Sequence, residues 1–288
     1  MSDDRAWGIF RELTHSPGRE TDDALILRRV AGCLEEAGFS VALKTTEEIA
    51  GGAEEPPSNL FVMCERLEIV ATLGRWEERG ACVVNRPEGI RNTYRDRTLA
   101  IFEREGIPFP RSVLVSTSSP APPGPTGSPD LSGCWVKRGD VHNLQPGDVV
   151  RAGDSEEAVG ALRDLARRGV SRAVLQENVD GDLVEFYGVA GPAENVTGGW
   201  FEWFSPRDPL GRHAFDADAL AETAARAAAA LGLEVWGGDA IVGPGGAPVV
   251  IDLNAWPSFA PYRETAAARI AARLVWRFRE RRGPGVTE

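Results

Sequence analysis

The chain is poor in the residues that build disulfide frameworks and zinc sites. Its 288 residues include four cysteines, far apart and without a Cys-x-x-Cys pair, and three histidines. Neither a disulfide scaffold nor a zinc site is therefore expected, and a reducing compartment is indicated. No apolar run approaches the roughly 18 residues of a membrane span, and the start MSDDRAWGIF lacks a secretory signal pattern. We expect a cytoplasmic protein without a membrane partner.

Clustered positive charge is also missing. The formal net charge is −11, and the 32 lysines and arginines are scattered along the chain instead of forming a stripe. This distribution argues against nucleic acid as a partner. The apolar fraction of 42% is ordinary for a folded protein, and the length is sufficient for one large core or two to three small ones.

Residues 1–88 alternate strand and helix patterns. Strand-like segments WGIF, SVALK, NLFVMC and ACVVN accompany an amphipathic helix in TDDALILRRVAGCLEEAGF, which Gly38 closes. Such alternation predicts a small parallel, Rossmann-like sheet with helices on its faces. We expect this α/β unit to be the N-terminal domain.

The rest of the chain has the pattern of two α+β units, 89–175 and 176–288. A helix is expected at 92–105 and strands at 112–116 and 134–137, and the prolines of 117–129 exclude regular structure. The strands AVLQENV and LVEFYGVAG flank a turn at Asp180-Gly181, as in an antiparallel hairpin. An Ala-rich helix near 216–231, two strands around GPGG and a helix from about 262 to 282 complete the pattern.

The strand pair around GPGG carries the most informative side chains. If WGGDAIV and APVVIDLN pair antiparallel about the middle of that turn, Asp239 stands opposite Asp252, and Asn254 shares their face. Two opposed carboxylates repel, so a positive group is expected between them. Two carboxylates and an amide oxygen suit Mg²⁺, with waters and phosphates as further ligands. The alternative is a solvated hairpin face whose acids point to water.

Two other segments offer polar groups to a ligand. Lys137 ends the strand CWVK and precedes the donor-rich loop RGDVHNLQPGD, which fits either a phosphate-binding lysine or a solvated strand-edge lysine. Gln176, Glu177 and Asn178 lie where a strand leaves the core, and they offer groups to an adenine edge or form a plain polar turn.

Taken in this order, the segments resemble the ATP-grasp superfamily, in particular carboxylate-amine ligases similar to glutathione synthetase and the ribosomal-protein glutamate ligases. The matching pieces are RDRTLAIFEREGIPFP, WVKRGD, QENVDGD, GGDAIV and IDLNAWPS, and the resemblance covers roughly residues 86–288. It implies a two-lobed ATP-grasp core after the small Rossmann-like sheet domain. The expected fold class is therefore α/β and α+β, with ATP lying between lobe A (89–175) and lobe B (176–288).

The resemblance also implies roles for individual residues. Lys137 would bind the α and β phosphates, and Arg97 falls where such proteins place a first phosphate-binding lysine. Mg²⁺, or Mn²⁺ as an alternative, would be held by Asp239, Asp252 and Asn254. The implied adenosine contacts are Gln176, Glu177, Asn178, Val179 and Asp182.

Substrate groups are expected on both sides of such a site. Ser258 and Arg263 follow the metal strand, where the family contacts the acceptor carboxylate, so Arg263 joins Lys137 as a candidate catalytic residue. Glu185 stands where relatives have a basic residue, and we expect it to point away from the phosphates or to contact a cationic substrate group. The remaining candidates are His142 in the loop after Lys137 and, from the loop after the first strand, Arg11, His15 and Arg19.

The resemblance implies an ADP-forming ligase that joins a small carboxylate to an amine through an acyl phosphate. A small-molecule kinase similar to the inositol phosphate kinases and a non-catalytic nucleotide-binding protein are the alternatives. The aromatic run WFEWF at 200–204 has aromatic side chains on both faces of a strand. It fits core packing or a homodimer interface, and otherwise a hydrophobic wall or lid at the substrate site.

Overall fold

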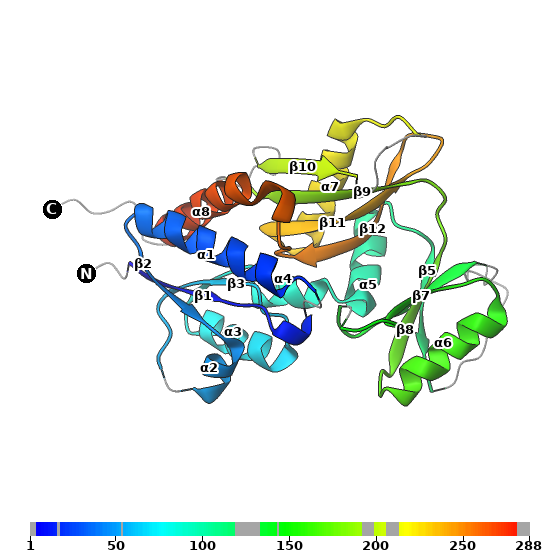
Figure 1. Cartoon of the computed structure of the whole chain (residues 1–288), viewed down its shortest axis with the longest axis horizontal. Helices are drawn as coiled ribbons and strands as arrows, with labels where there is room; N and C mark the ends of the chain where they lie inside the picture. The colour runs from blue at the N-terminus through cyan, green and yellow to red at the C-terminus, as the bar shows by residue number, and fades with distance from the viewer. Residues whose placement is uncertain are drawn as a thin grey trace.

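The computed structural model describes residues 4–15, 18–52, 54–118, 133–142, 144–191, 199–205 and 213–280. These ranges form three four-stranded sheets with helices packed on them (Figure 1). No helix among the described residues combines the length and apolar character needed to cross a membrane. Residues 119–129 of the expected Pro-rich loop and the last two residues of the expected C-terminal helix, 281–282, lie outside the described ranges.

The first sheet has the order β2-β1-β3-β4, and every neighbouring pair in it is parallel. Its strands are β1 (Arg5–Ile9), β2 (Ser40–Lys44), β3 (Asn59–Val62) and β4 (Cys82–Val84). Its helices are α1 (Glu20–Glu36), α2 (Thr46–Gly51) and α3 (Leu67–Glu78), with a short 3-10 turn at Leu13–His15. The α/β expectation for the N-terminal region is confirmed.

A middle lobe follows, with the antiparallel sheet order β5-β8-β6-β7. Its elements are β5 (Ser112–Ser116), β6 (Cys134–Arg138), β7 (Val149–Ala152), α6 (Ser155–Arg167) and β8 (Arg172–Glu177). The lobe has its own apolar core between the sheet and α6. Because β8 continues to Glu177, a division of the chain after residue 175 would cut through this strand.

The third sheet has the antiparallel order β10-β9-β11-β12. Its strands are β9 (Asp182–Val189), β10 (Trp200–Phe204), β11 (Val235–Val242) and β12 (Pro248–Ala255). Helix α7 (Ala217–Leu231) lies against β12, a 3-10 turn spans Ala260–Tyr262, and α8 (Arg263–Glu280) lies against β9. The expected hairpin of β8 with β9 is wrong: β8 already pairs with β5 and β6 on its two edges, so residues 178–181 cross from one sheet to the other.

Most of the helix expected at 92–105 forms α5 (Arg95–Glu105), but its expected first residue, Asn92, instead ends a separate short helix, α4 (Pro87–Asn92). The Thr93 hydroxyl donates to the Ile90 carbonyl at 2.7 Å, and Tyr94 is extended with φ −69° and ψ 132°. A side-chain bond to the backbone competes with helix continuation at this position. The break makes Arg95 the first residue of α5.

The two ends of the described chain pack together, and Figure 1 shows α1 and α8 side by side over the first sheet. Arg29 Nε lies 2.8 Å from a carboxylate oxygen of Glu264. The ring centroids of Phe39 and Phe278 are 5.7 Å apart. One buried cluster, here called the end cluster, joins the first sheet, α1, α8 and the third sheet. Its members include Phe61, Val84, Leu34, Tyr187, Trp256, Ile270 and Leu274.

The aromatic run at 200–204 forms β10, and both of its faces pack into the interior. Trp200 and Phe204 pack on the end cluster, whereas Phe201 and Trp203 pack on the apolar cluster beneath α7. The half-buried β10 therefore contributes to internal packing on both faces, and a homodimer interface stays a prediction.

Candidate active site

The hairpin of β11 with β12 has the register expected from the sequence. Asp239 is paired with Asp252, and Asn254 is paired with Gly237. A bulge follows, because Ala240 pairs with Val250 and leaves Ile251 as the extra residue. The metal candidates Asp239, Asp252 and Asn254 therefore share one face of the hairpin, and all three line one pocket.

Two basic side chains supply the positive charge expected near these acids. Arg95 Nη2 lies 2.9 Å from Asp252 Oδ2, and Lys137 Nζ donates to the Ile251 carbonyl at 3.2 Å. Both basic residues are buried. Arg97, the sequence's choice for the first phosphate-binding residue, is exposed and is not among the residues that line this pocket, so its role stays a prediction.

The pKa values of the hairpin acids move in opposite directions. Burial alone would raise the pKa of Asp252, but Arg95 and Lys137 outweigh it and hold that pKa well below its usual range. Burial, and then the charges of Asp252 and Glu185, raise the pKa of Asp239 to about 7. Burial also lowers the pKa of Lys137 to about 8. Negative charge at Asp239 is therefore incompletely balanced by the protein itself, which fits a site for an added cation.

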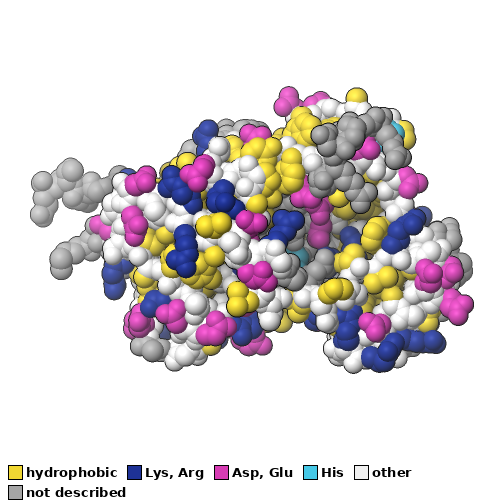
Figure 2. Space-filling view, in the orientation of Figure 1, with side chains coloured by type: hydrophobic (Ala, Val, Ile, Leu, Met, Phe, Trp, Pro, Cys, Tyr) yellow, Lys and Arg dark blue, Asp and Glu magenta, His cyan; other side chains and the backbone are white. Residues whose placement is uncertain are grey.

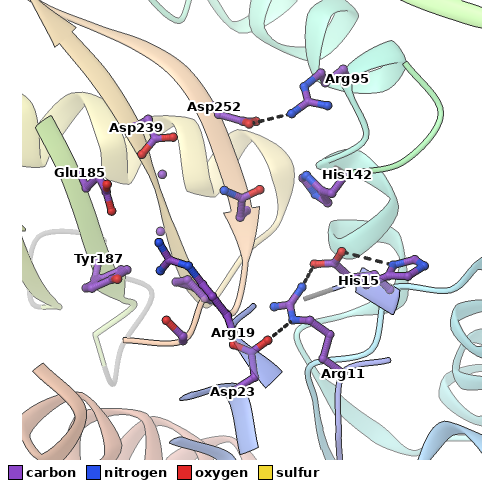
Figure 3. A pocket seen from close by; sticks show the side chains of 16 residues that line it. Arg11, His15, Arg19, Asp23, Arg95, His142, Glu185, Tyr187, Asp239 and Asp252 are labelled. Carbon is purple, nitrogen blue, oxygen red and sulfur yellow. Dashed lines mark hydrogen bonds and ion pairs between the residues drawn. The ribbon is translucent and has the colours of Figure 1, made fainter. Parts of the chain in front are cut away.

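The pocket has a volume of about 360 Å³ and lies between the hairpin, β9 and the first helix. Figure 2 shows its mouth between the middle lobe and the rest of the molecule, with acidic side chains along one wall. Of the candidates from the sequence it brings together Asp239, Asp252, Asn254, Ser258, Glu185, His142, Arg11, His15 and Arg19 (Figure 3). These residues come from segments that are far apart in the sequence, between residue 11 and residue 258.

The N-terminal wall of the pocket is a buried network of charges. Arg11 contacts the carboxylate of Glu65, lies 3.1 Å from Asp23 Oδ2, and donates to the Ala255 carbonyl at 3.2 Å. Burial alone would raise the pKa of Glu65, but Arg11 outweighs it and the pKa falls to about 2. His15 Nδ1 lies 3.8 Å from the same carboxylate. Arg11 thus connects the first sheet to the end of β12, and its charge is already compensated.

Arg263, expected at the substrate site, lies elsewhere. Its Nη2 is 2.6 Å from Asp22 Oδ1 in α1, and it does not line the pocket. The reason is the direction of the side chain at the start of α8, which faces α1. Arg19, just before α1, instead points into the pocket towards Glu185 and Asp239 (Figure 3).

The segment expected to hold adenine is engaged in contacts within the middle lobe and at the crossover. Glu177 Oε1 accepts from the Arg111 amide at 2.7 Å, and Asn178 Oδ1 accepts from Trp135 Nε1 at 3.1 Å. Asp182 Oδ2 accepts from the His213 amide at 2.9 Å. Val179 is half-buried. Adenine contacts by these residues stay a prediction.

Gln176 is buried beside Lys137 and Ile251, where the middle lobe meets the hairpin. The space enclosed there is about 10 Å³. A purine base is far larger than this volume, so binding of adenine at this position requires the middle lobe to move away from β12.

Sequence reasoning missed Arg95, Glu65 and Thr93. Arg95 is in the same RDR run as Arg97, and the two are distinguished only by where α5 begins. Glu65 follows the third parallel strand, so the rule that ligands meet carboxyl ends of strands would have selected it.

Within the described ranges, no three His, Cys, Asp or Glu side chains are grouped closely enough to hold a metal ion by themselves. A hard divalent cation at the hairpin would therefore use Asp239, Asp252 and the amide oxygen of Asn254 with outside oxygen ligands. This donor set is chemically suited to Mg²⁺, which retains waters and takes phosphate oxygens.

No family model matches the sequence, and no curated protein matches it. The structure is similar to D-alanine–D-alanine ligase from Bacillus anthracis, with a TM-score of 0.68, 12% identity and coverage of 98% of this chain and 99% of that chain. A RimK domain ATP-grasp protein from Sphaerobacter thermophilus aligns with a TM-score of 0.64 and 17% identity over 93% of this chain and 98% of that one. D-cycloserine synthetase DcsG aligns with a TM-score of 0.61 and 16% identity over 94% and 99%. These similarities confirm the fold that was expected from the sequence: the chain has the ATP-grasp fold.

Proposed function

We propose that the protein is an ATP- and Mg²⁺-dependent ligase that joins a small carboxylic acid to an amine through an acyl phosphate, releasing ADP and phosphate. The observation that carries this proposal is the shared pocket. The hairpin face with Asp239, Asp252 and Asn254 opens into the same cavity as Arg19 and His142. Groups suited to a nucleotide and groups suited to a second molecule therefore lie side by side.

The basic residues at the hairpin are suited to triphosphate binding. Lys137 and Arg95 are both buried next to Asp252. Among the described residues, neither makes an ion pair with a carboxylate other than those of the metal candidates. When bound, Mg²⁺ on Asp239, Asp252 and Asn254 would neutralise phosphate charge during transfer. Arg95 would then exchange its carboxylate partner for a phosphate oxygen, which its fork-shaped guanidinium binds equally well.

Arg19 is the best candidate for binding the acid substrate. Its guanidinium points into the pocket, and it makes no ion pair with any carboxylate among the described residues. Ser258 lines the same pocket and is buried. Arg19 would therefore take the role that the sequence assigned to Arg263. Positioning and charge neutralisation are sufficient for this chemistry, because the acyl phosphate needs no protein nucleophile.

Hydroxylamine trapping tests the proposal. The protein, Mg-ATP and a panel of amino acids and dicarboxylic acids are incubated with hydroxylamine, and hydroxamate and ADP are measured together. We expect both products with at least one acid, and neither with Asp252→Asn. ADP with a phosphorylated hydroxyl and no hydroxamate would instead indicate a kinase, and ATP binding without turnover a non-catalytic protein.

A further inference from the structure

Thr93 fixes the protonation pattern of His142. The Thr93 hydroxyl has one hydrogen, which it donates to the Ile90 carbonyl at 2.7 Å. The same oxygen lies 2.8 Å from His142 Nε2. Because the hydrogen of Thr93 is already used, its oxygen can only accept from the ring, so Nε2 carries the ring hydrogen. In the neutral imidazole, Nδ1 then holds the free lone pair.

Nδ1 is the ring nitrogen that remains available to a molecule in the pocket. His142 lines the cavity, and its ring makes no other hydrogen bond with the described residues (Figure 3). Burial lowers the pKa of His142, so the ring is neutral near pH 7. The charged groups facing it come from four segments: Glu65 after β3, Asp252 on β12, Arg95 on α5 and Arg11 after β1.

The loop that carries His142 is anchored at both ends. The side chain of Asp148 is fully buried and accepts a hydrogen bond from the Leu144 amide at 2.8 Å. Its Oδ1 lies 2.5 Å from Arg168 Nη1. At the start of the loop, the Gly139 carbonyl accepts from the Asp96 amide at 3.0 Å. The His142 ring also packs edge-on against the Tyr94 ring, with the two ring centroids 6.0 Å apart. The imidazole is thus fixed between the hairpin face and the acids of the N-terminal wall.

We propose that His142 Nδ1 is the base that removes the proton from the amine nucleophile, and that Thr93 is the positioning residue that keeps this nitrogen unprotonated. The inference rests on the proposed ligase function and adds the second half of its reaction. The amine nitrogen attacks the acyl carbon, the new C–N bond forms, and the C–O bond to phosphate breaks. Phosphate leaves with that electron pair, and the proton of the amine passes to Nδ1.

The surroundings suit this proton transfer. The imidazolium that forms is faced by the carboxylates of Glu65 and Asp252, and Thr93 continues to accept from Nε2. The proton then leaves to water or to the departing phosphate, so the neutral ring returns.

The ring tautomer is measured directly by NMR of ¹⁵N-histidine-labelled protein, which contains only three histidines. We expect the Nε2–H tautomer for His142 in the wild type and in Thr93→Ser, and a shift towards a mixture in Thr93→Val, which has no acceptor. An Nδ1–H tautomer or a protonated ring in the wild type near pH 7 overturns the proposal.

The catalytic role is tested by comparing two nucleophiles in His142→Gln. Glutamine can still donate an amide hydrogen to Thr93, but it offers no base. Hydroxylamine is largely unprotonated at neutral pH, so we expect hydroxamate formation to fall by a much smaller factor than condensation with an amine. Condensation with the amine that the wild type uses from an amino-acid mixture should fall about 10²- to 10⁴-fold, the usual contribution of a general base.

The two readouts separate failure of this inference from failure of the ligase proposal. Equal losses with both nucleophiles, or no loss with either, would overturn the role of His142. Absence of hydroxamate in the wild type would reject the ligase function, and His142 as a base would fall with it.

Discussion

Replacing Glu65 by Gln tests how the N-terminal wall of the pocket is held. The Glu65 carboxylate is 1% exposed and contacts Arg11. Gln has nearly the same shape but carries no charge. After the change, Arg11 would keep Asp23 at 3.1 Å as its main partner.

The magnitude follows from the pKa of Glu65. Burial would raise it, but Arg11, then His142 and His15, lower it from 4.5 to about 2. A difference of about 2.5 units corresponds to about 3.5 kcal/mol, at about 1.4 kcal/mol per unit. Removing one partner of a buried ion pair costs about 3–5 kcal/mol, which agrees. Because the folded pKa lies below the unfolded one, this stability is present above about pH 4.5 and is lost as the pH falls towards 2.

Urea unfolding of the wild type and Glu65→Gln near pH 7 and near pH 3 measures the effect. We expect the variant to be about 3.5 kcal/mol less stable near pH 7, and the gap to shrink by more than half near pH 3. Glu78→Gln, an exposed change in α3, is the matched control and should leave stability nearly unchanged. A gap below about 1 kcal/mol near pH 7, or one independent of pH, would refute the role of the network.

Other predictions concern the hairpin and its neighbours. Arg95→Met should lower the rate of ADP formation by at least about 10²-fold, whereas Arg97→Met should match the wild type, and the reverse order would mean that Arg97 is the phosphate ligand after all. Asp252→Asn should remove the Mg²⁺ dependence of ATP binding in calorimetry, and unchanged Mg²⁺-dependent affinity would place the metal elsewhere. Arg263→Met breaks a partly exposed pair with Asp22, so it should change the unfolding free energy by less than about 1 kcal/mol and leave hydroxamate formation intact. A large loss of rate would return Arg263 to the active site.

The elements predicted well from the sequence are those specified by local patterns. Strands of the first sheet follow short apolar runs bounded by turn residues, and α7 ends at Leu231 before Gly232 in the left-handed region with φ 79°. The Asp239–Asp252 pairing followed from strand period and turn position alone, because both partners lie within one hairpin.

The errors concern interactions between distant segments. Nothing local distinguishes two strands joined by a turn within one sheet from two strands in different sheets, and β8 and β9 are the latter. Which of Arg95 and Arg97 lies at the hairpin depends on where α5 begins, just after Thr93, whose buried hydroxyl donates to the Ile90 carbonyl. Arg263 was misplaced because the sequence does not show that α1 lies beside the start of α8.

The N-terminal wall of the pocket also depends on contacts between segments that are distant in the sequence. The loop after β1 was expected to face the cleft, and Arg11 and His15 do line the pocket. Their carboxylate partners Glu65 and Asp23 come from two other elements, and only the folded chain brings them together. Charge compensation, which decides whether an arginine is available to a substrate, is therefore a property of tertiary structure.

The end cluster also bears on how the protein is made by the ribosome. The first sheet ends at Val84, whereas α8, which covers one of its faces, begins at Arg263. At elongation rates of about 5–20 residues per second, about 10 to 40 seconds pass between synthesis of these two segments. During that interval Phe61 and Val84 lack the apolar side chains of α8 that enclose them in the finished molecule. Nascent chains of this protein are therefore expected to need chaperone protection until the last helix has left the exit tunnel.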